Sequence, residues 1–194
     1  MQSPYFNTTL ELDVKLFAKQ MDNNIYDNIK QNIEKIYLDK CYNDFGYIDK
    51  IYNINEEIKG GVINAEDFSA AAIFRVKFNC KICNPLKNTI IMGKIISINN
   101  RIIVANMGPI KFIIQENNFN VNNIQFKRTA YYPMVNNIII NKPITTGTYV
   151  MIKVLGKKII AGNTTIIVFG SLESVVDEET IEENIKNQYE VVET

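Results

Sequence analysis

The stretch TIIMGKIISINNRIIVANMGPIKFIIQ, residues Thr89–Gln115, decides the fold of this chain. Its β-branched runs, separated by short turns, predict a β-meander, because such side chains favour a pleated surface. Glycine inside the first strand would let the sheet bend sharply enough to close into a small barrel. The expected elements are a long first strand carrying Gly93, an Asn99-Asn100 turn, a strand at Arg101–Asn106, a Gly108-Pro109 turn and a strand at Ile110–Ile114.

Two further strands downstream supply what a small closed barrel needs. Thr148–Lys158 and Ile159–Phe169 are rich in β-branched residues, and a turn is expected at Ala161-Gly162-Asn163. With the meander they predict a five-stranded barrel of the OB type, a fold whose common use is to bind oligonucleotides on one face and its flanking loops.

The residues before the meander predict a curved antiparallel sheet covered by one helix. Apolar and polar residues alternate at its start, and isoleucines then recur at three- and four-residue spacing. The fold class is therefore α+β, with a β-α-β-β unit followed by the barrel. The elements expected, in order, are a strand at Phe6–Phe17, a helix after the capping residues Asp22-Asn23-Asn24, a strand at Tyr47–Ile54, a turn at Glu56–Ile63, a strand at Ala71–Lys81 and an end at Pro85.

The net charge of zero hides a strong polarity along the sequence. Residues 86–170 carry ten Lys and Arg against one acid, Glu116, whereas residues 171–194 carry one lysine against eight acids. A one-sided positive field attracts polyanions through phosphate contacts and counterion release. The plainer alternative is a lysine-rich solvated surface. If the barrel binds RNA, the candidate residues, which could converge on one face, are Lys94, Arg101, Lys111, Lys153, Lys157 and Lys158.

Two segments allow more than one interpretation. Residues 116–147 interleave basic and aromatic side chains, which suits either single-stranded nucleic acid or a loop pinned to its own domain; these side chains are Lys127, Arg128, Tyr131 and Tyr132, with Pro133 close to them. Within this segment Ile138–Ile140 predicts an extra strand or edge cover. Ser171–Thr194 becomes acidic and predicts a short helix or a disordered tail, which could shield the basic face or bind another protein.

Catalytic and metal chemistry find little support in the sequence. The chain has no histidine, no nucleophile elbow and no phosphate-binding glycine loop. Cys80 and Cys83 form a CxxC pair, but a structural zinc needs four ligands and Cys41 is the one further cysteine. We therefore expect a non-catalytic protein without cofactor or metal. No segment approaches the ~18 apolar residues of a membrane span, so we also expect no membrane partner and an intracellular location.

The order of these elements resembles the larger stalk subunit of archaeal and eukaryotic-type DNA-directed RNA polymerases, the archaeal E-subunit family. The resemblance covers about residues 5 to 175 and rests on the order and spacing of several short motifs. These motifs are Lys40-Cys41 to Tyr47, Gly61-Val62-Ile63, the strand AIFRVKFNCKICNPL at Ala72–Leu86, Met107-Gly108-Pro109 and Phe169-Gly170-Ser171-Leu172.

The resemblance implies a non-catalytic subunit with three parts. Residues 1–84 would be a tip domain that docks to the polymerase core subunits, residues 85–172 an S1-like barrel that guides nascent single-stranded RNA, and residues 173–194 an acidic tail. The candidates for core contact are Gly60, Gly61, Val62 and Ile63. Family members also pair with a smaller helical stalk subunit across the junction of the two domains, so that partner is expected here.

The sequence departs from the family pattern in one respect that bears on RNA. S1-like barrels that grip RNA usually carry aromatic residues on the second and third strands, where this chain has Ile103 and Val104, with Phe112 nearby. We therefore expect weak, salt-dependent binding led by lysines. AT-rich codon usage and sequence divergence favour a large DNA virus, located in the virion and host cytoplasm, over the nucleus of an AT-rich eukaryote.

Two other functions remain open at this point. One is a free-standing S1/OB-fold RNA-binding protein in translation or RNA processing. The other is a structural assembly module that makes no contact with nucleic acid.

Overall fold

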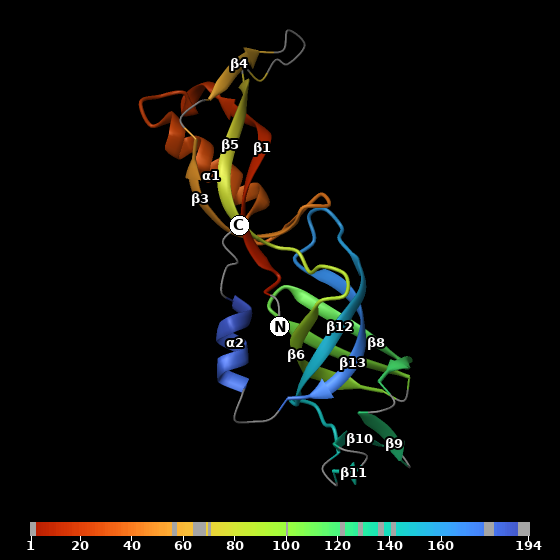
Figure 1. Ribbon diagram of the computed structural model, residues 1–194. Helices are drawn as coiled ribbons and strands as arrows, with labels where there is room; N and C mark the ends of the chain where they lie inside the picture. The colour runs from red at the N-terminus through yellow and green to blue at the C-terminus, as the bar shows by residue number, and fades with distance from the viewer. Residues whose placement is uncertain are drawn as a thin grey trace.

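The computed structural model shows an elongated molecule with a sheet-and-helix layer at one end and a barrel below it (Figure 1). The N-terminal sheet and α1 lie above the barrel, and a small three-stranded sheet extends from the far end. The structure describes residues 3–55, 58–63, 69, 71–99, 101–120, 123–127, 130–135, 138–140, 143–176 and 181–189.

The N-terminal sheet is antiparallel and is built around its longest strands. It has the order β1-β5-β3-β2, with the short strand β4 pairing with the first half of β5. Alternate residues of β1, from Leu10 to Leu16, are buried, as the period-two pattern predicts. The strands are β1 (Tyr5–Phe17), β2 (Cys41–Tyr42), β3 (Gly46–Ile54), β4 (Lys59–Ile63) and β5 (Ala71–Cys83).

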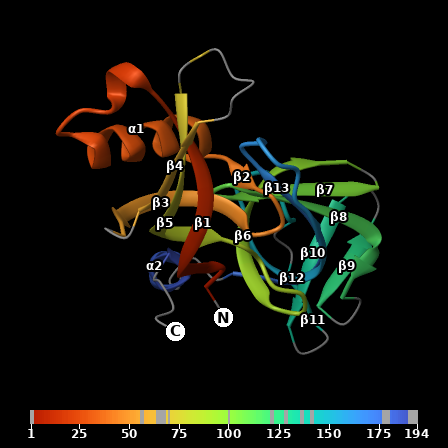
Figure 2. The ribbon, with the colours of Figure 1, turned by 90° about the horizontal axis from the view of Figure 1, so that it is seen from above.

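Helix α1 (Ile25–Tyr37) covers one face of this sheet, as Figure 2 shows from above. Ile29 and Ile33 are fully buried in a core that they share with Val76 and Phe78 of β5. Burying one such isoleucine contributes about 1.5–3 kcal/mol relative to leaving it exposed. A 3₁₀ turn, η1 (Ala18–Gln20), precedes the helix, and Asn28 Nδ2 donates to the Gln20 carbonyl at 2.9 Å.

The expected turn at Glu56–Ile63 is wrong for its second half. Lys59–Ile63 forms β4, which pairs with Ala72–Arg75 across a register shift at Gly60/Val62. Both glycines have positive φ values, +105° for Gly60 and +107° for Gly61, so they permit an irregular strand rather than a turn. Glu56 and Glu57 lie outside the described residues.

Five strands close into the predicted barrel in the order β12-β13-β8-β7-β6. All pairings are antiparallel except β13 with β8, whose parallel pairing closes the ring. The core holds fully buried Ile91, Phe112 and Val168, so Phe112 points inward and offers no outer aromatic surface. The strands are β6 (Ile90–Ile98), β7 (Ile102–Met107), β8 (Ile110–Phe119), β12 (Tyr149–Lys158) and β13 (Ile166–Val175).

The last barrel strand begins and ends later than expected. The sequence placed it at Ile159–Phe169, but Ile159 to Thr165 form a loop and β13 runs from Ile166 to Val175. Hydrogen bonds to another part of the chain hold that loop, because Cys41 N donates to Asn163 O at 2.7 Å and Gly162 N donates to Cys41 O at 2.8 Å. The strand propensity of a segment does not depend on hydrogen bonds to distant residues, so it could not predict this loop.

The segment between β8 and β12 forms a small sheet of its own, in the order β11-β10-β9. Tyr131 is 2% exposed and meets Phe119 edge to face at 4.9 Å, so this side chain is pinned to the barrel. Ile138–Ile139 forms the extra strand that the sequence predicted. The strands are β9 (Ile124–Lys127), β10 (Ala130–Val135) and β11 (Ile138–Ile139).

The acidic C-terminal segment contains helix α2 (Ile181–Tyr189), one of the two predicted possibilities. Figure 1 shows α2 beside the barrel, and it contacts β6. At its end, the Tyr189 ring lies 5.4 Å from the Tyr5 ring of β1. Tyr5 is 1% exposed and belongs to the barrel core together with Cys41 and Cys83. Sheet, barrel and α2 therefore share one packed junction.

Candidate nucleic-acid interface

Three of the predicted cations lie on one transverse row around the outside of the barrel. Lys94 of β6 is paired with Asn106 of β7, which is paired with Lys111 of β8. All three side chains are exposed. Because directly paired residues share a face and neighbouring strands lie about 4.8 Å apart, Lys94 and Lys111 stand about 10 Å apart at the backbone.

The row continues across the strand that closes the barrel. Lys111 is paired with Ile167 of β13, and Ile167 is paired with exposed Lys158 of β12. We call Lys94, Asn106, Lys111, Ile167 and Lys158 the basic row. It places a cation on β6, β8 and β12, so a polyanion that crosses the strands would meet successive lysines.

Tyr149 extends the basic row at its other end. It is paired with Lys94 on β6, and Lys94 Nζ lies 5.5 Å from the centre of its ring. Such a cation–π contact holds the ammonium group against the ring. Sequence reasoning missed Tyr149 and Asn106, although the register of the predicted strands carried the signal.

The other predicted cations lie elsewhere. Lys153 sits on β12, opposite Ser171, and its side chain is half-buried. Arg101 lies in the turn between β6 and β7, where its carbonyl accepts a hydrogen bond from Glu116 N at 3.1 Å. A shallow hollow beside it is lined by Ile98, Asn99 and Ile102. The six cations therefore do not share a single row.

Lys157 is engaged at the domain junction. Its Nζ donates to Asn84 Oδ1 and to the Pro85 carbonyl, the latter at 3.0 Å. Partial burial lowers the pKa of Lys157 below its usual value. A register shift between Val154 and Gly156 decides which face of the barrel each following side chain points to. Lys157 is paired with buried Val168 and Lys158 with Ile167, so the two adjacent lysines have different surroundings.

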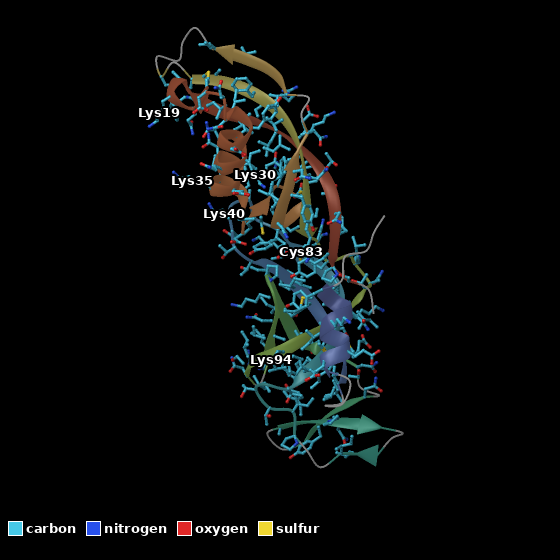
Figure 3. The ribbon with its side chains drawn as sticks, turned by 90° about the vertical axis from the view of Figure 1, so that its left-hand side faces the viewer. Lys19, Lys30, Lys35, Lys40, Cys83 and Lys94 are labelled. Carbon is cyan, nitrogen blue, oxygen red and sulfur yellow. The ribbon has the colours of Figure 1, made fainter. Side chains whose placement is uncertain are left out.

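The barrel surface carries almost no compensating negative charge. Residues 90–115 and 149–171, which hold most of the barrel strands, contain no Asp or Glu. The lysines along α1 differ in this respect. Figure 3 shows Lys30 and Lys35 of α1, with Lys19 before and Lys40 after the helix, well apart from Lys94, and the sequence interleaves these lysines with Asp22, Asp27, Glu34 and Asp39. The one-sided field belongs to the barrel.

Residues 116–147, between β8 and β12, are explained in part by one of the two interpretations given for them. Tyr131 is buried, whereas Tyr132 and Pro133 are half-buried. The side chains of Lys127 and Arg128 lie outside the described part of the structure. Tyr131 therefore fits a loop that is pinned to its own domain. For Lys127 and Arg128, that interpretation and binding of single-stranded nucleic acid both stay predictions.

The predicted docking residues lie at the far end of the N-terminal sheet. Val62 and Ile63 are each 61% exposed. A side-chain carbon on Gly61 would lie 3.3 Å from Phe74 Cε1, and one on Gly60 would lie 3.3 Å from the Ile73 carbonyl. Together with their positive φ values, this tight fit explains both glycines.

Phe17, at the end of β1, joins this exposed apolar surface and was missed by sequence reasoning. It is 45% exposed, and its partner in the sheet, Ala71, lies two residues along β5 from Ile73, the partner of Val62, so Phe17 and Val62 share a face next to Ile63. We call Phe17, Val62 and Ile63 the apolar tip. The signal for Phe17 was present, because it falls at a polar-face position of an alternating strand.

The cysteines lie in apolar surroundings. Cys41, Cys80 and Cys83 are buried and form no disulfide, and burial raises the pKa of Cys80 to about 11. Across the described residues there is no group of three or more metal-binding side chains. The helices in the described part of the chain are too short or too polar to cross a membrane.

Comparison with known proteins places the chain among transcription proteins. It is 33% identical over 159 residues to DNA-directed RNA polymerase subunit L376 of Acanthamoeba polyphaga mimivirus, which covers 81% of this chain and 76% of the relative. It is 24% identical over 110 residues to DNA-directed RNA polymerase II subunit RPB7 of Glycine max, covering 57% and 61% of the two chains. No protein-family model matches. The chain therefore belongs to the RPB7-like family of non-catalytic DNA-directed RNA polymerase subunits, in a form resembling that of a large DNA virus.

Proposed function

We propose that this chain is the stalk subunit of a multisubunit DNA-directed RNA polymerase, docking to the core through residues 1–84 and guiding nascent RNA with the barrel of residues 85–172. One observation carries the proposal. A bare apolar tip stands at one end of the molecule, and a barrel whose strands hardly carry an acid stands at the other. This division suits a protein that holds one partner and steers another.

The apolar tip supports the docking role. Phe17, Val62 and Ile63 expose large apolar side chains at one end of the N-terminal sheet. Such a cluster is favourable only when a partner covers it. We propose that the core subunits cover it, with Gly60 and Gly61 allowing the close backbone approach that side chains would block.

The shared junction supports the guiding role, because a guide has to be held in place. Cys41 and the loop at Gly162–Asn163 exchange two backbone hydrogen bonds. Lys157 adds its contacts to Asn84 and Pro85. These bonds tie the barrel to the sheet, so docking of the tip would also set the position of the barrel.

The basic row supports RNA as the guided molecule. Three lysines that contact phosphates of a single strand would give a slope of log K against log salt of about −2, since each contributes about 0.7. The affinity would then fall steeply between low and physiological salt. A guide that releases its transcript easily needs this kind of contact.

A smaller helical subunit is a further proposed partner, at the junction of the two domains. In this chain α2 already lies at that junction, with Tyr189 against Tyr5. We propose that such a partner, where present, contacts a surface that includes α2 and its acidic first turn, Glu182 and Glu183.

The viral relative supports a proposal on location. We infer that the chain works in a viral polymerase, in the host cytoplasm and in the virion, because the mimivirus subunit is the more similar of the two relatives and covers more of the chain. Fractionation of infected cells and purified particles, probed with an antibody to this chain, would test the location.

The docking role is tested by co-purification. We would express the tagged full chain in cells that make the polymerase and identify bound proteins by mass spectrometry. The wild type should recover the largest polymerase subunits. Val62→Asp should recover about tenfold less, because an unpaired carboxylate in a dry contact costs at least about 1.4 kcal/mol.

Ile36→Asp provides the matched control, because Ile36 is 53% exposed on α1 and lies outside the apolar tip. It should recover the core like the wild type. Absence of polymerase subunits from the wild-type preparation would overturn the proposal, and RNA binding in that same preparation would point to a free-standing RNA-binding protein.

A further inference from the structure

A second row of outer residues runs beside the basic row and is apolar. Phe169 of β13 is paired with Ile113 of β8, which is paired with Val104 of β7. Each lies two residues along its strand from a member of the basic row: Ile167, Lys111 and Asn106. Residues two apart share a face and are about 6.6 Å apart, so the rows run side by side.

Phe169 is the exposed member of this apolar row. Its neighbours Val168 and Gly170 are buried inside the barrel, whereas Phe169 is 42% exposed on the outside. Across the strand pair it faces Gly156, where an added side-chain carbon would meet nothing within 4 Å. The ring therefore borders open space on its Gly156 side.

Lysines flank this ring on both sides along β13. Two residues before it, Ile167 is paired with Lys111 on one neighbouring strand and with Lys158 on the other. Two residues after it, Ser171 is paired with Lys153. A phenyl ring with cations on either side, in strand segments without an acid, matches a base and the phosphates around it.

We propose that Phe169 is the base-stacking residue of a single-stranded RNA site on the outside of the barrel, with Lys111, Lys158 and Lys153 on the adjoining phosphates. This inference rests on the proposed function and adds to it the aromatic contact that the second and third strands lack. Ile113 and Val104 extend the apolar surface under the neighbouring bases. Because strands lie about 4.8 Å apart, the three residues of this row span about 10 Å.

Charge favours RNA over a protein as the occupant. The cations nearest the ring on β8 and β12 are Lys111, Lys158 and Lys153, and residues 90–115 and 149–171 contain no carboxylate, Glu116 of β8 and Glu173 of β13 lying just beyond them. Protein interfaces deplete lysine at their apolar centre. A single exposed aromatic ring is also enough to stack one base, because every base presents a flat face whatever the sequence.

The experiment measures binding of a fluorescently labelled oligouridine of ten nucleotides to the full chain by anisotropy, over a series of salt concentrations. Phe169→Ala should weaken binding about five- to a hundredfold and leave the salt slope unchanged, since stacking releases no counterions. Phe169→Tyr should retain the affinity. Lys111→Gln should lower the salt slope by about 0.7.

Tyr26→Ala is the matched control, because Tyr26 is an aromatic residue 45% exposed on α1, which packs on the N-terminal sheet and not on the barrel. Its affinity should equal that of the wild type, and circular dichroism should show each variant folded. If Phe169→Ala binds like the wild type while Lys111→Gln binds more weakly, the stacking role is overturned, RNA guiding stands, and the apolar row becomes a protein contact. If the wild type binds no RNA even at low salt, both proposals fail.

Discussion

Ile152 fills the space that two glycines leave on either side of it, and this arrangement predicts how the barrel responds to added methyl groups. A Cβ at Gly93 of β6 would lie 2.9 Å from Ile152 Cδ1, and one at Gly170 of β13 would lie 2.4 Å from Ile152 Cγ2. Neither glycine has a positive φ, so the constraint is space rather than backbone conformation. We predict that alanine at either position destabilises the barrel.

The two substitutions should differ in size and in how they are rescued. Overpacking a core costs about 1–3 kcal/mol, with Gly170→Ala at the upper end because the clashing carbon is fixed to Cβ of Ile152. Ile152→Val removes Cδ1 and keeps Cγ2. It should therefore recover part of the loss from Gly93→Ala, with a coupling of about 0.5–2 kcal/mol, and recover nothing for Gly170→Ala. Phe112 Cδ2, at 3.2 Å from the Gly93 Cβ position, limits the first rescue.

Urea unfolding followed by circular dichroism measures these differences in free energy of unfolding. Gly156→Ala is the control, because its added carbon meets nothing within 4 Å and its φ is not positive, so its effect should be neutral or stabilising by up to about 1 kcal/mol. Equal rescue of both alanine variants by Ile152→Val, or a loss for Gly156→Ala as large as for Gly170→Ala, would refute the packing argument.

Three further predictions concern the domain junction and the core of the N-terminal sheet. Lys157→Gln should change the salt slope of RNA binding less than Lys158→Gln, because Lys157 is bonded to Asn84 and Pro85; anisotropy titrations compare them, and equal effects would contradict this. Tyr189→Ala should release α2 and speed its removal by a protease, seen by mass spectrometry, since the ring contacts Tyr5; an unchanged rate would oppose it. Burial raises the pKa of Cys80 from 9.0 to about 11, so its contribution to stability is complete below pH 9 and is lost as pH rises through 11. In urea titrations, the free energy of unfolding of the wild type should therefore fall relative to that of Cys80→Ala as pH rises over that range, and parallel curves would contradict the assignment.

Much of the architecture follows from local patterns. The alternation in β1, the isoleucine spacing of α1 and the turns around Gly108 each predicted their element to within a few residues. These signals are local because side-chain periodicity within one element depends on that element alone. The charge contrast between the barrel and the tail was equally visible, since it is a property of composition.

The candidate site could be predicted as a list of residues and not as an arrangement. Lys94, Lys111 and Lys158 were identified from charge, but Lys157 and Lys158 could not be told apart, since a register shift in β12 decides their surroundings. The sequence showed Phe169 as part of the motif Phe169-Gly170-Ser171-Leu172 but did not show that its ring is exposed. Its position depends on where β13 begins, and the loop that sets that start is held by bonds to Cys41.

The sequence by itself determined that a basic barrel would follow an antiparallel sheet, with an acidic segment after the barrel. Only the tertiary structure decided which residues became neighbours. Parallel pairing of β13 with β8 brings Lys111 level with Lys158 and sets Phe169 between lysines, and the docking of α2 joins Tyr189 to Tyr5. The physical reason is that strand order and register in a closed barrel are set by the closure of the whole sheet, a constraint that no single segment contains.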